Sequence, residues 1–321
     1  MKRRRLASHA IFSFAAFSSS CVPPGPRRET PAVTADLAPT VRAVGCIGLT
    51  VANADRSAAF FENVLGFTSA PTEVVEGPQH ARLEGIPGAR TKRVRVNLGA
   101  ECLELSQPLG GIRRLMPGDT RDNDLWFQHV AIVVRDIDAA YSMLEAAHVA
   151  HLSVAPQTLP AWNPAAGGIR AYYFKDPDAH ALEIIWFPPG KGRSRWHADA
   201  GSAIFLGIDH TAIAVEDTMT SVRFYQHLGF HVVATSENWG PEQERLNAVP
   251  GAHLRITSLR VDAGPGVELL EYLAPRGGRA APADERGDDI AHWRTALLAD
   301  GARVPTALRD PDGHSLEIHA P

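Results

Sequence analysis

Two histidines and one cysteine occupy matching positions in runs of small and apolar residues. His129 lies in LWFQHVAIVV, His210 in FLGIDHTAIAV and Cys46 in VRAVGCIGLTV, and a helical pattern follows each run directly. Imidazole and thiol groups bind metal ions and exchange protons, but a lone strand histidine is more often a satisfied core residue. The recurrence of the position, rather than any single residue, therefore favours a functional site.

Four glutamates in strand-like segments each follow a leucine: Glu104, Glu183, Glu271 and Glu317. Residues two apart share one face of a strand, so Glu183 lies beside Ala181 and Ile185. A carboxylate buried among such apolar neighbours is strongly unfavourable without a partner of opposite charge. Each of these glutamates therefore needs a cation.

The runs that carry the histidines have one bulky face and one face of small residues. His129 shares its face with Ala131, whereas Val130 and Ile132 take the other, and the run around His210 divides in the same way. The bulky face can pack under a helix. The face of small residues leaves room for a cavity beside the histidine.

The chain contains an internal repeat. Residues 41–67 and 206–230 share an alternating strand, a polar start signal, a helix and a Leu-Gly-Phe ending, in which the glycine caps the helix. The sequence therefore predicts two tandem halves. Two further matches extend the repeat: RLEGIPGAR (82–90) with RLNAVPGAH (245–253), and LELSQP (103–108) with LEYLAP (270–275).

A fainter copy of the same plan lies within each half. Residues 127–147 again predict a strand followed by a helix, and FKDPDAHALEI (174–184) predicts a turn followed by a strand. RDPDGHSLEI (309–318) repeats that turn and strand at the C-terminus. The pattern predicts four units, each a strand, a helix and a meander of strands, with the fourth incomplete.

A repeated βαβββ unit with a histidine on its first strand and a glutamate on its last resembles the vicinal oxygen chelate superfamily. That superfamily includes glyoxalase I, bleomycin-resistance proteins and extradiol dioxygenases. The likeness covers about residues 41–318, and the D-P-D-[AG]-H-x-L-E segments at 176–183 and 310–317 are its most specific local signature. The resemblance implies an α+β fold in which tandem βαβββ modules form half-open mixed β-barrels with flanking helices. The expected glyoxalase-like domains are 41–190 and a truncated 207–321, joined by a linker at 191–206.

The resemblance also implies metal ligands on the first and fourth strands of each module. Length shows how far the fourth module departs, because 59 positions separate Asp124 from Glu183 but only 28 separate the equivalent Asp289 from Glu317. Either a helix and a strand have been lost, or 290–300 forms the helix and the first strand is missing. Carried over by position, the ligands are Cys46 and Glu104, His129 and Glu183, and His210 and Glu271. In the fourth module Arg294 stands at the histidine position, so only Glu317 remains.

Pairing of the modules decides which ligands meet. If neighbours pair, one site holds Cys46, Glu104, His129 and Glu183, and the other holds His210, Glu271 and Glu317. If the second module pairs with the third, as in fused glyoxalase I enzymes, one site holds His129, Glu183, His210 and Glu271. The crossed arrangement is favoured because it confines the defects to the first and fourth modules. A two-His, two-Glu set suits a divalent metal ion, Zn²⁺, Ni²⁺, Fe²⁺ or Mn²⁺, and leaves positions for two substrate oxygens.

The resemblance implies a metal-dependent glyoxalase-like lyase or isomerase that acts on a small molecule with vicinal oxygens. Glu183 or Glu271 is then the catalytic residue that moves the proton. One alternative is an extradiol-type dioxygenase, against which the extra glutamate argues. Another is a non-catalytic small-molecule-binding protein like the bleomycin-resistance relatives. The loop 157–170 is a candidate lid, and either Tyr172 or Tyr173 faces the cavity.

Composition and the N-terminus bound the partners and the location. The 321 residues carry a formal net charge of −4 without a basic stripe, which argues against nucleic acid as a partner. Residues 1–21 read as an export signal, with Cys21 as a candidate lipid anchor, and the Pro-rich 22–40 as a tether. The sequence thus predicts an exported protein, periplasmic or a membrane-anchored lipoprotein, and a monomer or homodimer. Whether Cys46 and Cys102 form a disulfide stays open.

Overall fold

The computed structural model describes residues 40–110, 114–198 and 201–321, all within one compact unit. The expected export signal and all but the last residue of the expected tether lie outside the described residues. No helix in the described ranges is long and apolar enough to cross a membrane.

The described chain consists of four modules, and their elements are as follows. The first holds β1 (Thr40–Thr50), α1 (Ala54–Leu65), β2 (Thr68–Ser69), β3 (Glu73–Glu76), α2 (Pro78–Glu84), β4 (Arg90–Leu98) and β5 (Glu101–Pro108). The second holds β6 (Gln128–Val134), α3 (Ile137–Ala146), β7 (Ala150–His151), β8 (Gln157–Thr158), β9 (Arg170–Lys175) and β10 (Ala181–Trp186), followed by the 3₁₀ turn η1 (Ser194–His197). The third holds β11 (Phe205–Val215), α4 (Thr218–His227), β12 (His231–Trp239), α5 (Pro241–Asn247), β13 (His253–Arg260) and β14 (Gly266–Ala274). The fourth holds only β15 (Trp293–Asp300), β16 (Thr306–Arg309) and β17 (Ser315–His319).

Local signals fix where the long helices begin and end. The side chain of Asn53 accepts a hydrogen bond from the Arg56 amide at the start of α1, and Asp217 caps α4 in the same way. The glycines of the two Leu-Gly-Phe endings, Gly66 and Gly229, have φ values of 70° and 104°. Only glycine adopts these conformations without strain, so the predicted helix ends are confirmed.

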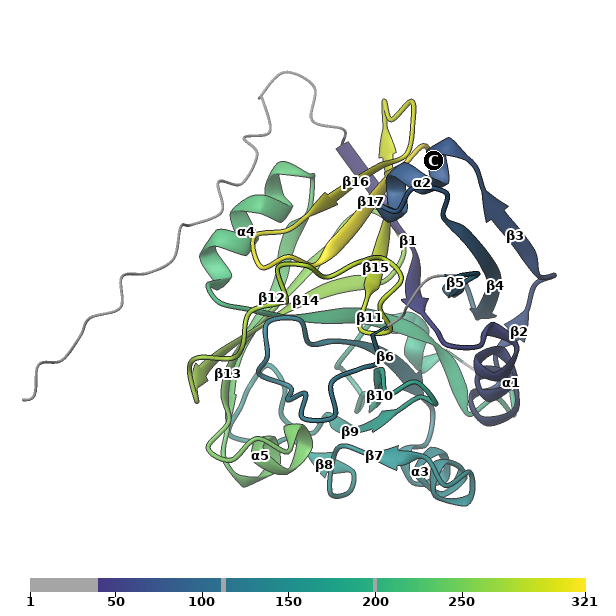
Figure 1. Cartoon of the computed structure of the whole chain (residues 1–321). Coiled ribbons are helices and arrows are strands. Elements are labelled where there is room, and N and C mark those ends of the chain that lie inside the picture. The colour runs from purple at the N-terminus through teal and green to yellow at the C-terminus, as the bar shows by residue number, and fades with distance from the viewer. Residues whose placement is uncertain (1–39, 111–113, 199–200) are drawn as a thin grey trace, which may run out of the picture. The chain divides into compact units, whose positions relative to one another are not determined.

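The modules pair in the crossed arrangement that the sequence favours. One sheet has the order β16-β17-β15-β1-β5-β4-β2 and joins the first module to the fourth. The other has the order β12-β13-β14-β11-β6-β10-β9-β7 and joins the second to the third. In each sheet the two first strands, β1 with β15 and β6 with β11, pair antiparallel at the centre. Figure 1 shows the two mixed sheets with α1, α3 and α4 on their outer sides, which confirms the predicted α+β class.

Two reciprocal contacts hold the crossed pairs together. Arg114, after the first module, binds Asp289 before the fourth with Nε and Oδ2 3.0 Å apart. Arg279, after the third module, binds Asp124 before the second at 2.9 Å. A backbone hydrogen bond of 2.8 Å, from the residue after each aspartate to the arginine carbonyl, reinforces both contacts. The contacts that pair the modules thus lie on the segments that precede β6 and β15.

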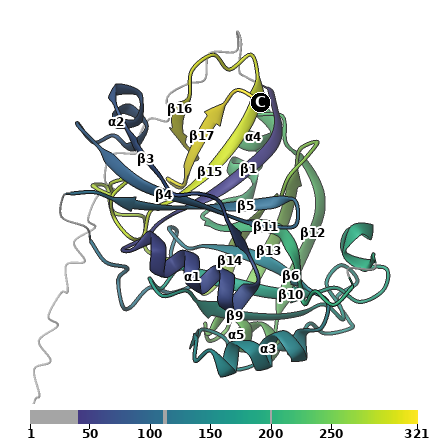
Figure 2. The same cartoon turned by 90° about the vertical axis from the view of Figure 1, so that its right-hand side faces the viewer.

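The D-P-D turns join the two sheets. His180 Nδ1 lies 2.9 Å from Asp176 of its own turn, and its Nε2 lies 2.7 Å from the carbonyl of Ile290, just before β15. His314 Nε2 lies 2.9 Å from the carbonyl of Ala214 on β11. The His180 side chain therefore stabilises its own turn, and both histidines bridge the sheets. Figure 2 shows the sheet of β1 and β15 beside that of β6 and β11.

The fourth module keeps its first strand and has lost a helix. Residues 293–300 form β15, and only a short loop separates it from β16. Arg294 pairs with Ser315, two residues before Ala296 pairs with Glu317. His129 and Glu183 stand in the same register on β6 and β10. Arg294 therefore occupies the position of a histidine, as the sequence alignment predicts.

An arginine fills the place of a metal in the sheet of β1 and β15. The guanidinium of Arg294 is buried and lies 2.8 Å from Glu84 Oε1 and 3.8 Å from Glu317 Oε1. A Cβ on Gly48 of β1 would lie 3.0 Å from Nε of Arg294, so this glycine makes room for the side chain. Burial raises the pKa of Glu317, but His319 and Arg294 outweigh it and hold the pKa at about 2.

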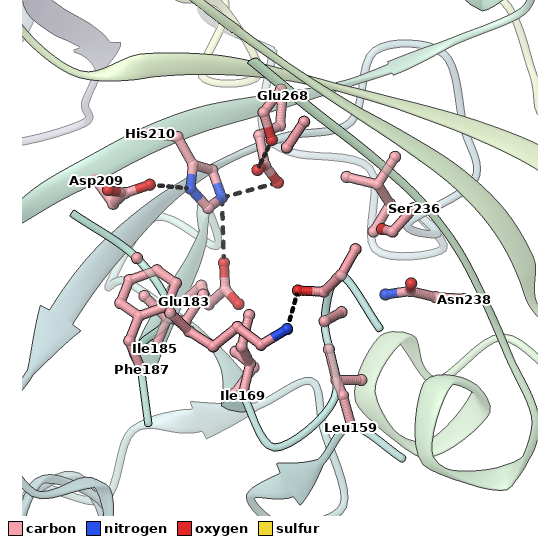
Figure 3. A pocket seen from close by; sticks show the side chains of 18 of the residues that line it. Leu159, Ile169, Glu183, Ile185, Phe187, Asp209, His210, Ser236, Asn238 and Glu268 are labelled. Atoms are coloured by element: carbon pink, nitrogen blue, oxygen red, sulfur yellow. Dashed lines mark hydrogen bonds and ion pairs between the residues drawn. The ribbon is translucent and has the colours of Figure 1, made fainter. Parts of the chain in front are cut away.

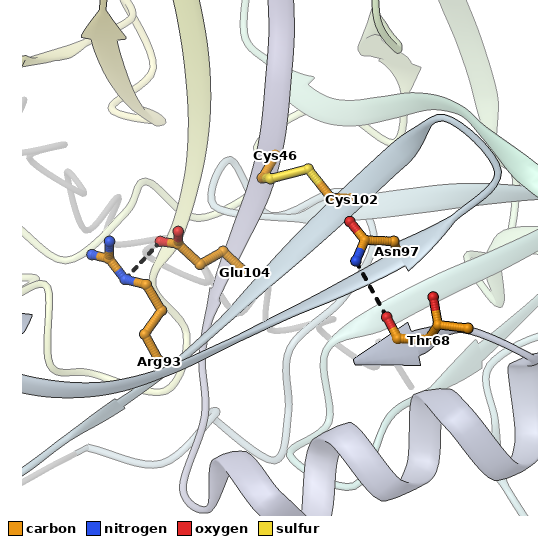
Figure 4. Close-up of a disulfide and its surroundings, with 6 residues drawn as sticks. All are labelled: Cys46, Thr68, Arg93, Asn97, Cys102 and Glu104. Carbon is orange, nitrogen blue, oxygen red and sulfur yellow. Dashed lines mark hydrogen bonds and ion pairs between the residues drawn. A yellow bond between two sulfur atoms is a disulfide. The ribbon is translucent and has the colours of Figure 1, made fainter. Parts of the chain in front are cut away.

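The other candidate ligands of this sheet are also bonded to or paired with neighbouring side chains. Cys46 and Cys102 form a disulfide (Figure 4), so neither is a thiolate ligand. Glu104 lies 3.0 Å from Nε of Arg93 on the neighbouring strand. The four residues at the ligand positions of the first and fourth modules are thus all paired with other side chains.

Replacing Arg294 with leucine should lower the free energy of unfolding by about 3–5 kcal/mol, because Glu84 and Glu317 lose their buried cation. Urea denaturation at pH 7 measures the change. The control Arg90→Leu breaks an exposed pair with Glu76 and should change stability by less than about 1 kcal/mol. Equal small effects for the two variants would contradict the structural role of Arg294.

Candidate metal centre

Three of the predicted ligands come together in the sheet of β6 and β11. His129 on β6, Glu183 on β10 and His210 on β11 each offer a donor atom, all within 4.8 Å of one another. Oε2 of Glu183 lies 3.1 Å from Nε2 of His129 and 3.5 Å from Nε2 of His210. All three residues are buried. They face inward because β6 and β11 turn their bulky residues, such as Ile132 and Ile213, toward the helices.

The fourth predicted ligand, Glu271, lies elsewhere, and Glu268 takes its place. In the parallel register of β11 and β14, Ala212 pairs with Glu268, just as Ala131 pairs with Glu183. Glu268 Oε2 lies 3.4 Å from Nε2 of His210. Glu271 is three residues further on and therefore points to the opposite face of the strand. There its carboxylate accepts hydrogen bonds from Arg255 at 3.0 Å and from the Thr218 amide at 3.4 Å.

The sequence pointed to the wrong glutamate because β14 carries two. The one that follows a leucine, Glu271, is not the one that lies near His210. The match of LELSQP with LEYLAP aligns Glu104 with Glu271, whereas the structure places Gly48 of β1 opposite Glu104 and Ala212 opposite Glu268. Glu104 lies four residues before Pro108, whereas its structural counterpart Glu268 lies seven residues before Pro275, so the sequence match is shifted by three residues. Strand alternation would have found Glu268 only if the register between β11 and β14 had been known.

The donor set fits a divalent metal ion. Ligand atoms bound at about 2.0–2.2 Å in octahedral or tetrahedral geometry lie roughly 2.8–3.6 Å from their neighbours. The three observed contacts between imidazole nitrogens and carboxylate oxygens, 3.1, 3.5 and 3.4 Å, fall within that range. Two imidazoles and two carboxylates are a set that suits Zn²⁺, Ni²⁺, Fe²⁺ and Mn²⁺ alike.

A second layer of contacts orients His210. Its Nδ1 lies 3.1 Å from Oδ2 of Asp209, which leaves Nε2 directed at the two glutamates. Asp209 in turn accepts hydrogen bonds from Arg260 and Trp196, each at 2.8 Å. His129 is held differently, since its buried Nδ1 has no hydrogen-bond partner among the described residues and its ring packs against Tyr173 at 4.8 Å.

The electrostatics of the site favour a cation. Burial lowers the pKa of His210, but Glu268, Asp209 and Glu183 outweigh it and raise the pKa well above its usual value. Burial raises the pKa of Glu183, and hydrogen bonds with His129 and His210 reverse that shift. A carboxylate-rich site of this kind is stabilised by positive charge, whether a proton on imidazole or a metal ion.

The ligands lie at one end of a cavity of roughly 350 Å³ (Figure 3). Glu183, His210 and Glu268 line that end, and the His129 ring lies behind them. Aliphatic side chains, together with Ser236, Asn238 and Gln243, form much of the remaining wall. The volume is at the small end of the range for sites that bind small molecules.

Two further expectations about the cavity are resolved. Tyr173 lines it, whereas Tyr172 packs in the core under α3. The predicted lid, 157–170, contributes Leu159 and Ile169 to the wall. It is fastened to β12, since Trp162 stacks on Trp239 with ring centroids 4.0 Å apart.

Comparison with known proteins identifies the family. The sequence profile described as the Glyoxalase/Bleomycin resistance protein/Dioxygenase superfamily matches residues 43–184 and 207–318. The chain belongs to this superfamily, which confirms the resemblance seen in the sequence.

The individual proteins that resemble this chain have low sequence identity to it. A 2-epi-5-epi-valiolone epimerase from Actinomyces is 32% identical over 159 residues, which is 47% of this chain and 83% of the epimerase. The structure of glyoxalase I from Zea mays aligns with a TM-score of 0.54 at 15% identity, over 87% of this chain and 92% of that one. A putative dioxygenase from Bacillus subtilis aligns with a TM-score of 0.51 at 13% identity, over 88% and 86%. The solved structures show the fold, and the family indicates an enzyme of general isomerase or lyase type.

Substitution of the two neighbouring glutamates should separate their roles. Glu268→Gln should weaken the binding of Ni²⁺ or Zn²⁺ by at least about 10- to 100-fold, because a direct ligand matters no less than its supporting contacts. Glu271→Gln, the matched control on the same strand, should leave metal affinity unchanged. Titration of metal-free protein with each ion measures both. Loss of affinity in Glu271→Gln alone would restore the assignment made from sequence.

Proposed function

We propose that this protein is a metal-dependent lyase or isomerase of the glyoxalase type, which acts on a small molecule with vicinal oxygens. The observation that carries the proposal is the convergence of His129, Glu183, His210 and Glu268 at the end of a cavity. The epimerase relative supports isomerisation, since its name describes inversion at a carbon centre.

The residues divide into holding groups and one proton-moving group. A divalent ion, when bound, supplies Lewis-acid polarisation of a substrate oxygen, which makes the adjacent C–H bond more acidic. His129, His210 and Glu183 are the most deeply buried ligands and hold fixed positions. Asp209 keeps the His210 ring in the orientation that presents Nε2 to the site.

Glu268 is the best placed general base. Its side chain is 20% exposed, compared with 5% for Glu183, and it lines the cavity where substrate binds. The Ser258 hydroxyl donates a hydrogen bond to Oε1 of Glu268, so this carboxylate retains a partner when it turns toward the substrate. Glu268 accepts the proton from the substrate carbon and returns it to the same or the neighbouring carbon. The overall reaction is then an isomerisation without net oxidation.

The two alternatives rest on fewer observations. The putative dioxygenase neighbour shares the fold, but a dioxygenase would need a free ligand position for O₂, and the second carboxylate beside His210, that of Glu268, argues against one. A non-catalytic binding protein would need the cavity but no base near it, whereas Glu268 lines the cavity.

We also propose that the protein is exported, as the basic N-terminus and apolar run of residues 1–21 indicate. The disulfide between Cys46 and Cys102 supports this location, because disulfides persist in oxidising compartments. Reduced glutathione is scarce there, so a substrate without glutathione is favoured.

Metal-loaded protein should catalyse exchange of a substrate C–H proton with solvent deuterium. The assay follows, by proton NMR in D₂O, a panel of α-hydroxyketones and hemithioacetals made with small thiols. Glu268→Gln should slow the exchange by about 10²- to 10⁴-fold, the usual contribution of a general base. Glu271→Gln should retain it.

Three controls decide between the classes of function. Removal of the metal with a chelator should abolish exchange, and its return should restore it. Oxygen uptake with catechols by the iron-loaded protein, without exchange, would replace the proposal with a dioxygenase. If the protein is purified without metal and binds none, the non-catalytic small-molecule-binding function replaces the proposal.

A further inference from the structure

The segment that joins the two halves forms one wall of the cavity. Lys191, Gly192 and Arg193, from the turn after β10, line it. The turn is closed by a 3.0 Å hydrogen bond from the Lys191 amide to the Pro188 carbonyl. Gly192 has a φ of 69°, and a Cβ there would lie 2.6 Å from the ring of Phe187. Glycine is therefore required for this turn to place both cations on the cavity wall.

Arg193 forms no salt bridge with a described residue. Among the described residues, no carboxylate lies within 4.0 Å of it, and Nη1 donates a hydrogen bond of 3.3 Å to the Gly264 carbonyl. Other arginines nearby are paired, since Arg195 lies 2.6 Å from Glu101 and Arg260 lies 2.8 Å from Asp209. Burial, together with Arg195 and Arg260, lowers the pKa of Arg193.

Lys191 is in a similar state. Its Nζ donates hydrogen bonds to the backbone carbonyls of Pro164 and Ala165 in the lid, and none of the described carboxylates pairs with it. Carbonyl oxygens orient an ammonium group but leave its charge in place. Both cations thus line one cavity, and neither forms a salt bridge with a described carboxylate. Lysine and arginine side chains in this state are typical partners for carboxylate and phosphoryl groups.

We propose that Lys191 and Arg193 form an anion-binding subsite, and that the substrate carries a carboxylate or phosphoryl group in addition to its vicinal oxygens. This inference rests on the proposed function of the metal centre. Lys191 and Arg193 line the same cavity as Glu183, His210 and Glu268, so one small molecule bound there contacts both the metal centre and the subsite.

Matched hydroxamates test the subsite, because a hydroxamate binds metal through two vicinal oxygens. The probes are butyrohydroxamate, which is neutral, the monohydroxamate of succinate, and 3-phosphonopropionohydroxamate. Calorimetric titration into the metal-loaded protein should show an anionic probe binding about 10- to 100-fold more tightly than the neutral one. The better of the two anionic probes distinguishes a carboxylate from a phosphoryl group.

Variants connect the preference to the subsite. Arg193→Gln should remove most of it and leave the affinity for butyrohydroxamate unchanged, whereas Arg193→Lys should retain part of it. Lys191→Gln should weaken it. Arg90→Gln removes the same charge from the other sheet and should have no effect. Thermal melting of each sample establishes that the variants are folded.

Two results would overturn the inference in distinguishable ways. Equal affinity for the neutral and anionic probes, or a preference that survives Arg193→Gln, removes the subsite and leaves the metal centre intact. Failure of all three hydroxamates to bind removes the metal centre, and with it the inference that depends on it.

Discussion

A buried carboxylate needs a cation, and this requirement organises both sheets. In each module, the residue two positions after the ligand position of the first strand pairs with a glutamate on the last strand. This residue is small, for example Ala131 or Gly48. The four glutamates are thus equivalent in the fold but differ in what balances them. Imidazoles of His129 and His210 contact those of the second and third modules. Arg93 contacts that of the first module, and Arg294 and His319 contact that of the fourth.

Crossed pairing of the modules decides which side chains share a sheet. The contacts of Arg114 with Asp289 and of Arg279 with Asp124 join the first module to the fourth and the third to the second. Because of this pairing, the disulfide and Arg294 fall in one sheet, and both histidines fall in the other. Pairing of neighbours would have placed one imidazole in each sheet, and neither set would have been complete.

The repeat made most of the fold and three of the residues that converge at the candidate metal centre predictable. His129, Glu183 and His210 followed from recurring positions, and Arg294 followed from the alignment of the fourth module. Glu268 did not, because its strand carries two glutamates and only hydrogen bonding between β11 and β14 shows which one faces His210. Nor does the alignment reveal the contacts of Arg114 and Arg279, since a long-range ion pair leaves no local pattern.

The crossed topology also explains why the connecting segment belongs to the site. β10 and β11 both lie next to β6, so the chain leaves the second module and enters the third within the same sheet. β10 ends and β11 begins at the same end of that sheet, so the connection between them lies there. Lys191 and Arg193 lie on this connection and line the cavity without taking part in strand pairing. Substrate preference can therefore change on this segment while the register that aligns Glu183 and Glu268 with the histidines stays fixed.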